Sequence, residues 1–433
     1  MTIRNSVRLA CLARESPDPL TAHITRADLE ALDREDRLRP FRVRFFLPED
    51  TIYLDGNSLG AMPKAVPARM REVAEEEWGR DVIRSWNIHG WIDLQTKIGG
   101  KIGRLIGAGE GETIVADSTS INLFKVLSAA LALNPTRKVI LSERENFPTD
   151  LYVAEGLIRL LDQGHVLRTA LPEEFPEVID DTIACVMLTH VSYRTGRMYD
   201  MAKITEAAHA KGALMSWDLA HSAGAMPLDL AGVRADFAVG CGYKFLNGGP
   251  GAPAFLTIAK RHQDRVVPAL SGWFGHAAPF AFEGTFRPAE GIARAAVGTP
   301  PVLSLAALEV GVDLMLEASL DEIRAKSLRQ ADIFAGLMEQ ELADHGFRRV
   351  TPEDPAQCGS QMCFAHEQGW PIIQCLTAHN VIGDFRAPDI VRFGVTPLYL
   401  GYTELWDAVA ILRRIMDARL WDAPEFHRRA KVT

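Results

Sequence analysis

The sequence lacks the residue patterns that mark several common kinds of site. Its six cysteines are scattered without a CxxC pair, and its twelve histidines show no HExxH or comparable ligand spacing. Neither a disulfide framework nor a zinc site is therefore indicated, and the cysteines fit reduced thiols in a cytosolic protein. No GxxxxGK[ST] or GxGxxG pattern occurs, which makes ATP and dinucleotides poor candidates as ligands.

Concentrated positive charge and long apolar runs are also scarce. The net charge is −9, whereas nucleic-acid binding depends on clustered lysine and arginine. The start of the chain, MTIRNSVRLACLARESPDPL, has only a short apolar stretch that Arg14 and Glu15 bring to an end. It fits neither a secretory signal nor a membrane span. We therefore expect a cytoplasmic protein with no nucleic-acid or membrane partner and no metal.

What is present is the composition of an ordinary soluble protein. The chain has 433 residues, of which 47% are apolar and 24% charged, and it is long enough for one large and one smaller domain. In the middle, short apolar runs of strand length alternate with helical stretches such as 201–212, which ends at Gly212. This alternation predicts an α/β fold with a mostly parallel sheet covered by helices. The predicted strands are 138–142, 183–190, 213–218, 236–242 and 252–258.

The pattern changes from about residue 302 onward. A long helical pattern runs through 305–346, and strand-like pieces follow around 347–395, which predicts a smaller α+β C-terminal domain. Near the other end, TRADLEALDREDRL (25–38) predicts a helix within an N-terminal arm. We expect an arm at 1–60 that packs with the small domain, a large domain at 61–301 and a small domain at 302–433.

Two candidate site residues follow predicted strands of the sheet. Asp218 ends the strand at 213–218, with His221 in the turn beyond it, and Lys244 comes just after the strand at 236–242. Because ligands gather beyond the carboxyl ends of parallel strands, an acid and an amine are expected at the same rim. The plainer interpretations are a helix-capping aspartate, a packing histidine and a surface lysine.

A third element could bind a phosphate. Ser118, Thr119 and Ser120 immediately precede an apolar helical run, and hydroxyls with free backbone N–H groups at a helix start form an anion site. An ordinary N-cap needs only one of the three. An aspartate, a lysine and a monophosphate site together suggest pyridoxal phosphate, because a lysine forms an imine with its aldehyde and a carboxylate keeps its ring nitrogen protonated.

Eight segments, in order, resemble a known family. They are YLDGNSLGAMPK (53–64), FPTDLY (147–152), LTHVSYRTGRMYDM (188–201), SWDLAHSAG (216–224), GYKFLNGGPG (242–251), SGWFGH (271–276), VGTPP (297–301) and RFGVTPLY (392–399). Over nearly the whole chain the sequence resembles the kynureninases, pyridoxal phosphate enzymes of fold type I in the class V aminotransferase superfamily. The resemblance implies that fold, pyridoxal 5′-phosphate as cofactor, and a homodimer with shared active sites.

The resemblance also implies roles for individual residues. Lys244 would bind the cofactor covalently, and both Lys244 and Tyr243 would be catalytic. Arg392 would grip the substrate carboxylate, and Asn57 and Ser58 would help to line the substrate pocket, although both are also plausible turn formers. The implied cofactor-binding residues are Thr119, Ser120, Phe147, Asp150, Asp218, His221, Tyr243, Lys244 and, from the neighbouring subunit, Trp273 and Thr299.

The implied reaction is the hydrolytic cleavage of L-kynurenine, or of 3-hydroxy-L-kynurenine, to anthranilate or 3-hydroxyanthranilate and L-alanine, within tryptophan degradation and NAD biosynthesis. Three alternatives stay open. A cysteine desulfurase would use Cys358 in PAQCGSQMCF as its nucleophile, but this cysteine has no basic neighbour in sequence. The other two are a transaminase and a cofactor-binding scaffold without activity.

Overall fold

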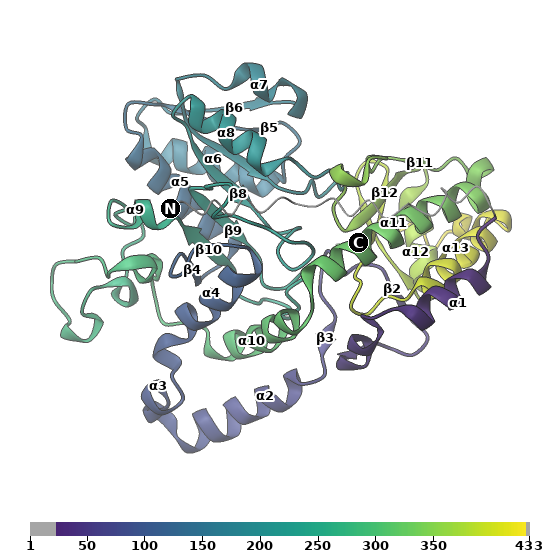
Figure 1. The fold of residues 1–433 in the computed structure, drawn as a ribbon, viewed down its shortest axis with the longest axis horizontal. Coiled ribbons are helices and arrows are strands. Elements are labelled where there is room, and N and C mark those ends of the chain that lie inside the picture. The colour runs from purple at the N-terminus through teal and green to yellow at the C-terminus, as the bar shows by residue number, and fades with distance from the viewer. Residues whose placement is uncertain (1–22, 430–433) are drawn as a thin grey trace, which may run out of the picture.

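A seven-stranded sheet forms the centre of the larger part of the molecule in the computed structural model, which describes residues 23–429 (Figure 1). The strand order is β4-β10-β9-β8-β7-β5-β6, with β6, β5, β7, β8 and β9 parallel and β10 antiparallel to both of its neighbours. The strands are β4 (Thr113–Val115), β5 (Val139–Glu143), β6 (Val166–Ala170), β7 (Ile183–Thr189), β8 (Leu214–Asp218), β9 (Phe237–Gly240) and β10 (Phe255–Ile258).

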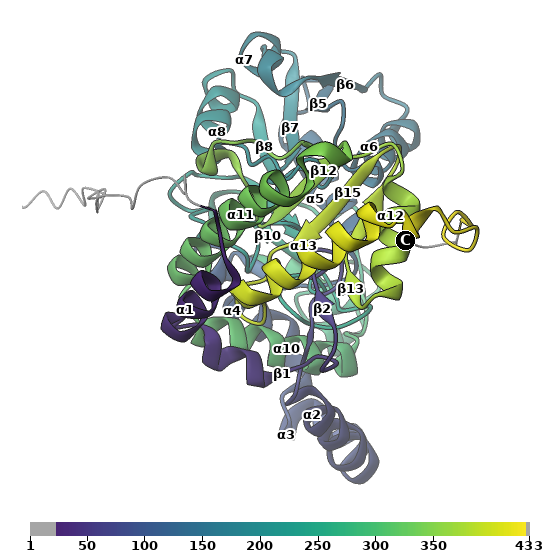
Figure 2. The ribbon, with the colours of Figure 1, turned by 90° about the vertical axis from the view of Figure 1, so that its right-hand side faces the viewer.

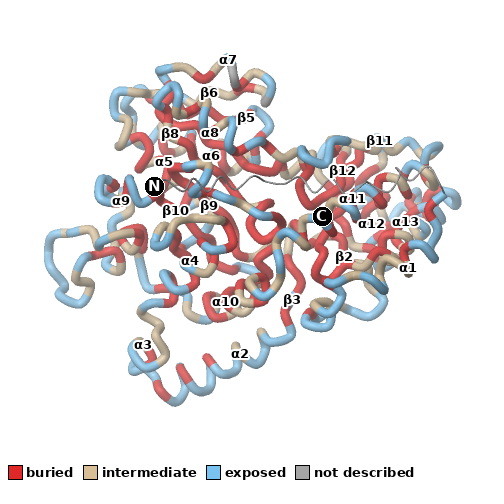
Figure 3. Tube along the Cα trace, in the orientation of Figure 1, coloured by how far each residue is buried: buried red, intermediate tan, exposed pale blue. Residues whose placement is uncertain are grey.

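The strands form here because they are apolar on both faces. Every residue of β7 and β9 is buried, as is typical of parallel strands covered by helices. Figure 3 shows this burial concentrated in the sheet. All five predicted strands are confirmed, with ends shifted by up to three residues. The helices of this part are α2 (Val66–Glu72), α3 (Ser85–Ile88), α4 (Leu94–Leu105), α5 (Thr119–Leu133), α6 (Pro148–Leu161), α7 (Phe175–Val178), α8 (Met201–Ala210), α9 (Lys260–Gln263) and α10 (Val302–Glu317), of which α2 and α3 project away from the sheet (Figure 1).

The C-terminal part contains a second, antiparallel sheet of order β11-β12-β15-β14. Helix α13 crosses in front of β12 and β15 in the view of Figure 2. This arrangement is the α+β organisation that the sequence predicts. The elements are α11 (Leu320–Leu342), β11 (Arg348–Arg349), β12 (Gln361–Ala365), α12 (Gly369–Ala378), β14 (Asp384–Arg386), β15 (Ile390–Gly394) and α13 (Tyr402–Asp417).

The helical pattern expected at 305–346 is two helices rather than one. Ser319 separates them and caps α11, since its side chain accepts a hydrogen bond from the backbone N–H of Glu322 at 3.3 Å. Helix α10 packs on α4 and α2, and its Leu308 and Val312 belong to the core of the large sheet. The boundaries predicted at 60/61 and 301/302 stay a prediction, and the packing of α10 favours a small domain that starts nearer to residue 320.

The N-terminal arm is attached to the small domain by its helix and by a strand. Helix α1 (Arg26–Glu35) begins at a capping box formed by Thr25 and Asp28, and it packs along α13. Asp33 of α1 accepts hydrogen bonds from the backbone N–H groups of Tyr402 and Thr403, at 2.7 and 2.9 Å, and so caps the start of α13. The short strands are β1 (Phe45–Phe46) with β3 (Met62–Pro63), and β2 (Ile52–Tyr53) with β13 (Val381–Ile382).

Several sequence expectations concern absences or thiols. In the described part of the chain, no helix combines the length and the apolarity needed to cross a bilayer. Among residues 23–429, no group of three or more histidine, cysteine or acidic side chains is arranged to hold a metal ion. Five cysteines are free and buried, and Cys11 lies outside the described residues.

Candidate active site

A cavity of about 560 Å³ lies beyond the carboxyl ends of β7, β8 and β9. Lys244 lines it, and the Lys244 Nζ lies 2.9 Å from Nε2 of His221. Asp218, the last residue of β8, lines the same cavity. The acid and the amine predicted to share one rim of the sheet therefore do so. Thr119, Ser120, Phe147, Asp150 and Tyr243 are also among its lining residues.

The surroundings of Lys244 disfavour its charged form. Burial lowers the pKa of the Lys244 amine, and the nearby cations Arg392 and Arg386 lower it further, against the opposing effects of Cys241 and Asp218. Burial also holds the pKa of His221 well below its ordinary value, so this ring is neutral at pH 7. A neutral amine is the nucleophilic form, and the site thus favours covalent chemistry at Lys244.

Two buried carboxylates face this cavity. Asp218 accepts a hydrogen bond from the N–H of Ala220 at 2.7 Å, and Asp150 accepts one from the Thr189 hydroxyl at 3.3 Å. Burial raises the pKa of both groups, and the charge of Asp218 raises that of Asp150 further. Within residues 23–429 neither carboxylate forms an ion pair. Two buried acids without a counterion suit a ligand that brings a positive charge.

The start of helix α5 opens onto the same cavity. Ser118 caps the helix, and its hydroxyl accepts a hydrogen bond from the N–H of Ile121 at 3.4 Å. The backbone N–H groups of Thr119 and Ser120 have no hydrogen-bond partner in the part of the chain that the structure describes. Free N–H groups and the positive end of a fifteen-residue helix make this an anion site.

Aromatic side chains form another wall. Phe147 precedes α6 and is 41% exposed, and its ring centroid lies 5.2 Å from that of Tyr193 in an edge-on contact. Tyr243 is half-buried, with its ring centroid 5.9 Å from the Lys244 Nζ. Burial raises the pKa of the Tyr243 phenol, so it is protonated at neutral pH and can donate a proton.

The GNSLG turn is held against the lysine loop. The N–H of Gly60 donates to the carbonyl of Tyr243 at 2.8 Å. A Cβ atom at Gly60 would lie 2.2 Å from the carbonyl oxygen of Lys244, which is closer than such atoms approach. Gly60 is therefore required by the close approach of two backbones. This contact fixes the turn that carries Asn57 and Ser58 relative to Lys244.

Arg392 lies behind the cavity wall rather than on it. It is 1% exposed, and its guanidinium grips Asp384 through Nε, at 2.7 Å from Oδ1, and through a second, shorter contact to Oδ2. It also donates to the carbonyl of Tyr193 at 2.7 Å and to the hydroxyl of Ser58 at 2.9 Å. Ser58 in turn donates to Asp384 at 2.8 Å. Asn57 is fully buried beside this group.

Asp384 is a residue that sequence reasoning missed. It lies directly opposite Arg392 in the β14–β15 pair. Burial alone would raise the pKa of Asp384, but Arg392 together with Arg386, which forms an ion pair with Asp384 at 2.8 Å, and the Ser58 hydroxyl more than offset this, and the pKa is lowered. The APD turn in DFRAPDIVRF was a signal for a hairpin, but the register that places Asp384 opposite Arg392 could not be predicted from it.

Trp273 and Thr299 are not brought into this cavity. Trp273 is 38% exposed, and its ring packs edge-on against Phe274 and Phe280, with centroids 4.9 and 5.7 Å away. Thr299 is exposed. The chain on its own therefore supplies the lysine, the acids and the helix start, but not these two residues.

The chain is similar to known proteins over almost its whole length. A family model described as the kynureninase C-terminal domain matches residues 323–412. A kynureninase from Pseudomonas fluorescens is 52% identical over 414 residues, which cover 94% of this chain and 100% of that protein. A kynureninase from Burkholderia pseudomallei (strain 1106a) is 51% identical with the same coverage.

Solved structures are similar in fold at low identity. A cysteine desulfurase from Thermococcus onnurineus NA1 has a TM-score of 0.74 at 18% identity and covers 88% of this chain and 98% of its own. A lysine-to-alanine mutant of C-DES, with glycine covalently linked to its PLP cofactor, has a TM-score of 0.73 at 16% identity and covers 86% and 98%. These structures confirm the predicted α/β fold of type I. Because two kynureninases share about half of their residues with it over almost its full length, the chain belongs to the kynureninase family.

Proposed function

We propose that this protein is a pyridoxal phosphate enzyme that hydrolyses L-kynurenine, or its 3-hydroxy derivative, to anthranilate or 3-hydroxyanthranilate and L-alanine. The observation that carries the proposal is the meeting of Lys244, Asp218 and the start of α5 around one cavity, in a chain that shares 52% identity with a kynureninase. The cavity volume of about 560 Å³ lies within the range of small-molecule sites.

The residues present fit pyridoxal 5′-phosphate. The free N–H groups of Thr119 and Ser120 suit its phosphate. Nδ1 of His221 is buried with no hydrogen-bond partner among the described residues, so it has a contact to offer a ligand. Asp218 would face the pyridine nitrogen, with Asp150 beside the phenolic oxygen and Phe147 against the ring. A protonated pyridine nitrogen would give the buried Asp218 a counterion.

When bound, pyridoxal phosphate would supply an aldehyde for covalent attachment and a protonated ring that accepts electrons from the substrate's α-carbon. Asp218 would hold the proton on the ring nitrogen. Lys244, whose pKa burial lowers, would act as the base at the substrate's α-carbon. Tyr243, which keeps its proton at neutral pH, would be the proton donor at the substrate carbonyl or at the β-carbon.

Substrate orientation is assigned to Arg392 with Asn57 and Ser58. In the structure Arg392 is already held by Asp384, so a substrate carboxylate would bind at the remaining N–H of its Nη1 and at Ser58, in competition with Asp384. Asp384 thereby keeps the buried guanidinium neutralised until the substrate arrives. The choice between kynurenine and 3-hydroxykynurenine depends on ring contacts of this cavity.

The quaternary part of the proposal is a homodimer with shared sites. Trp273 and Thr299, which lie outside the cavity of their own chain, would reach the phosphate in the neighbouring subunit. Exposed Phe280 and Phe282, at 60% and 79% exposure, lie in the same segment as Trp273 and would be covered by such contact. We also expect the enzyme to be cytoplasmic, an inference that rests on the sequence.

A cysteine desulfurase is the main alternative, and Cys358 argues against it. This residue is 3% exposed, and its thiol donates to the carbonyls of Pro352 and Asp354 at 3.0 and 3.3 Å. Burial raises the pKa of the Cys358 thiol, which opposes formation of the thiolate nucleophile. Cys358 also does not line the cavity of Lys244.

The test is to incubate the purified protein, loaded with pyridoxal phosphate, with L-kynurenine and to measure anthranilate and alanine. Equal amounts of both are expected. Lys244→Ala should lower turnover by about 10²–10⁴-fold, whereas Lys260→Ala, at an exposed lysine, should not change it. Sulfide release from cysteine without kynurenine cleavage, or full turnover by Lys244→Ala, would overturn the proposal.

A further inference from the structure

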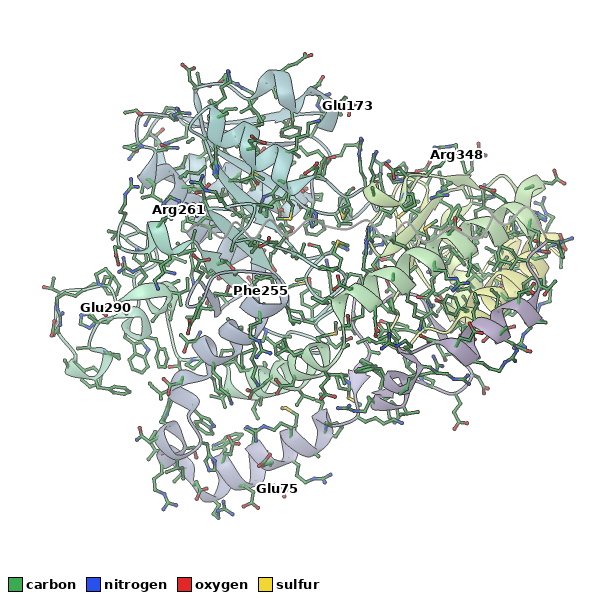
Figure 4. The ribbon with its side chains drawn as sticks, viewed as in Figure 1. Glu75, Glu173, Phe255, Arg261, Glu290 and Arg348 are labelled. Carbon is green, nitrogen blue, oxygen red and sulfur yellow. The ribbon has the colours of Figure 1, made fainter. Side chains whose placement is uncertain are left out.

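A second cavity, of about 770 Å³, lies between the two domains. We name it the interdomain cavity. The sheet domain contributes the segment after β7, which includes His190 and Arg197, and the small domain contributes Arg324 of α11 and the neighbouring Gln357. Glu173, at its rim, lies on the edge of the sheet domain nearest to the small domain (Figure 4). Its volume is in the range of small-molecule sites.

Two arginines in this cavity form no ion pair with any residue in 23–429, although the charge of Arg197 acts on the pKa of the nearby buried Glu143. The side chain of Arg197 makes neither a hydrogen bond nor an ion pair with any residue in 23–429. Among residues 23–429, Arg324 donates only to the backbone carbonyls of Cys358, Pro355 and Gly359, at 2.7, 3.2 and 3.5 Å, and burial lowers its pKa. The backbone of Arg197 forms a β-bridge with the same Cys358, which brings the two arginines to one side of the cavity. A half-buried guanidinium that forms no ion pair favours binding of an anion, and burial raises the pKa of Glu143, which disfavours the charged form of that carboxyl.

A buried polar atom points to a ligand independently. His190 is 4% exposed and lines the cavity, and its Nδ1 has no hydrogen-bond partner among the described residues. Burial lowers the pKa of His190 to about 4, so the ring is neutral at pH 7 and can accept or donate one hydrogen bond. Buried polar atoms are almost always paired, by protein, water or ligand.

The acidic residues of the interdomain cavity do not cancel this preference. Asp200 caps α8 by accepting a hydrogen bond from the N–H of Lys203 at 3.0 Å, and Asp229 accepts one from the N–H of Gly232 at 2.8 Å. Glu173 is exposed at the rim. The remaining wall is apolar and rich in sulfur, with Met198 and Met226 lining it. Thioethers pack well against the edges of aromatic rings.

We propose that the interdomain cavity binds a small aromatic carboxylate, with its carboxylate at Arg197 and Arg324 and its ring against Met198 and Met226. The site is separate from the Lys244 cavity. The two cavities lie on opposite sides of one strand end, because Thr189 lines the first and the next residue, His190, lines the second. His190 also donates its backbone N–H to the carbonyl of Asp218 at 2.9 Å, so a ligand in the interdomain cavity adjoins the backbone that carries Asp218.

The test measures binding of labelled benzoate to the cofactor-loaded enzyme by equilibrium dialysis. In Arg197→Met, the affinity of the interdomain cavity for benzoate should fall at least tenfold, so that one benzoate site per chain is lost. This loss is expected whether or not the Lys244 cavity also binds benzoate. The side chain of Arg197 forms no hydrogen bond or ion pair with any residue in 23–429. Arg348→Met is the matched control, since Arg348 is an exposed arginine of the same small domain as Arg324 (Figure 4), and it should bind as the wild type does.

Met198→Glu is a second, independent variant. It places a negative charge against the expected anion and should lose the same site. The proposal is overturned if the wild type binds no benzoate, or if either folded variant binds the same number of benzoate molecules with the same affinity as the wild type. An equal loss of benzoate binding in Arg348→Met would also overturn the proposal, because binding would then depend on the net charge of the protein rather than on the interdomain cavity.

Discussion

Replacing Asp384 by leucine should strongly destabilise the small domain. Arg392 is 1% exposed, and the substitution would leave its guanidinium buried without the carboxylate that it grips through two contacts. Breaking a buried ion pair from one side costs about 3–5 kcal/mol. Since a whole domain is stable by only about 5–15 kcal/mol, the urea midpoint followed by circular dichroism should fall markedly.

The double variant Asp384→Leu with Arg392→Met separates a charge effect from a packing effect. Replacing both by apolar side chains removes the unpaired charge of Arg392, so the double variant should cost less than Asp384→Leu alone, although both variants lose the ion pair of Asp384 with Arg386 at 2.8 Å. Arg392→Met alone should cost less than Asp384→Leu, because Asp384 keeps its ion pair with Arg386 at 2.8 Å. Glu317→Ala is the control, as it breaks an ion pair with Arg44 in which both side chains are about half exposed, and it should cost less than about 1 kcal/mol.

The pH dependence has a definite sign. The pKa of Asp384 is lowered from its ordinary value of 3.8, so its contribution to stability is present above pH 3.8 and is lost as the pH falls through the lowered value. The difference in stability between the wild type and Asp384→Leu should therefore narrow only below pH 3.8. A double variant as unstable as the sum of its singles, or a stability difference that disappears near pH 7, would refute the reasoning.

Three further predictions concern the Lys244 cavity. Gly60→Ala should lower kcat/KM by about 10²-fold, because the new Cβ displaces the lysine loop. The control Gly100→Ala, in open space on α4, should leave activity unchanged and raise the free energy of unfolding by about 1 kcal/mol. Equal kinetics of the two variants would contradict this prediction. Asp218→Asn should bind the cofactor yet lose at least about tenfold in kcat, since the ring nitrogen loses its carboxylate; unchanged kcat would dismiss the role. Mixing inactive Lys244→Ala and Trp273→Ala after joint refolding should restore about one quarter of wild-type activity in hybrid dimers, and no recovery would argue against shared sites.

The parts of this fold that depend on local pattern could be predicted from the sequence. Apolar runs gave the strands, and the rule that parallel strands end at one edge brought Asp218 and Lys244 together before any geometry was known. The pairing of Arg392 with Asp384 could not be found this way. It depends on the register of a hairpin, and nothing in the alternation of residues indicates that a guanidinium turns toward its own chain rather than toward a ligand.

Two other features lay beyond sequence reasoning for different reasons. The helical pattern at 305–346 has no proline or internal glycine cluster to mark a break, so its division at Ser319 depends on a cap that competes weakly with helix continuation. The interdomain cavity requires the contact of segments more than 120 residues apart, since His190 and Arg324 come from different domains. Such a site has no motif, because its residues are neighbours only after folding.

The cap that Asp33 provides for α13 has a practical consequence for anyone who shortens this protein. A truncation that removes α1 would take away the acceptor for two amides at the start of a helix near the far end of the chain, together with the ion pair between Arg26 and Asp407. Losing a cap of this kind costs about 0.5–2 kcal/mol before any loss of packing is counted. Shortened expression forms should therefore begin before Thr25, even though no residue of that helix touches the Lys244 cavity.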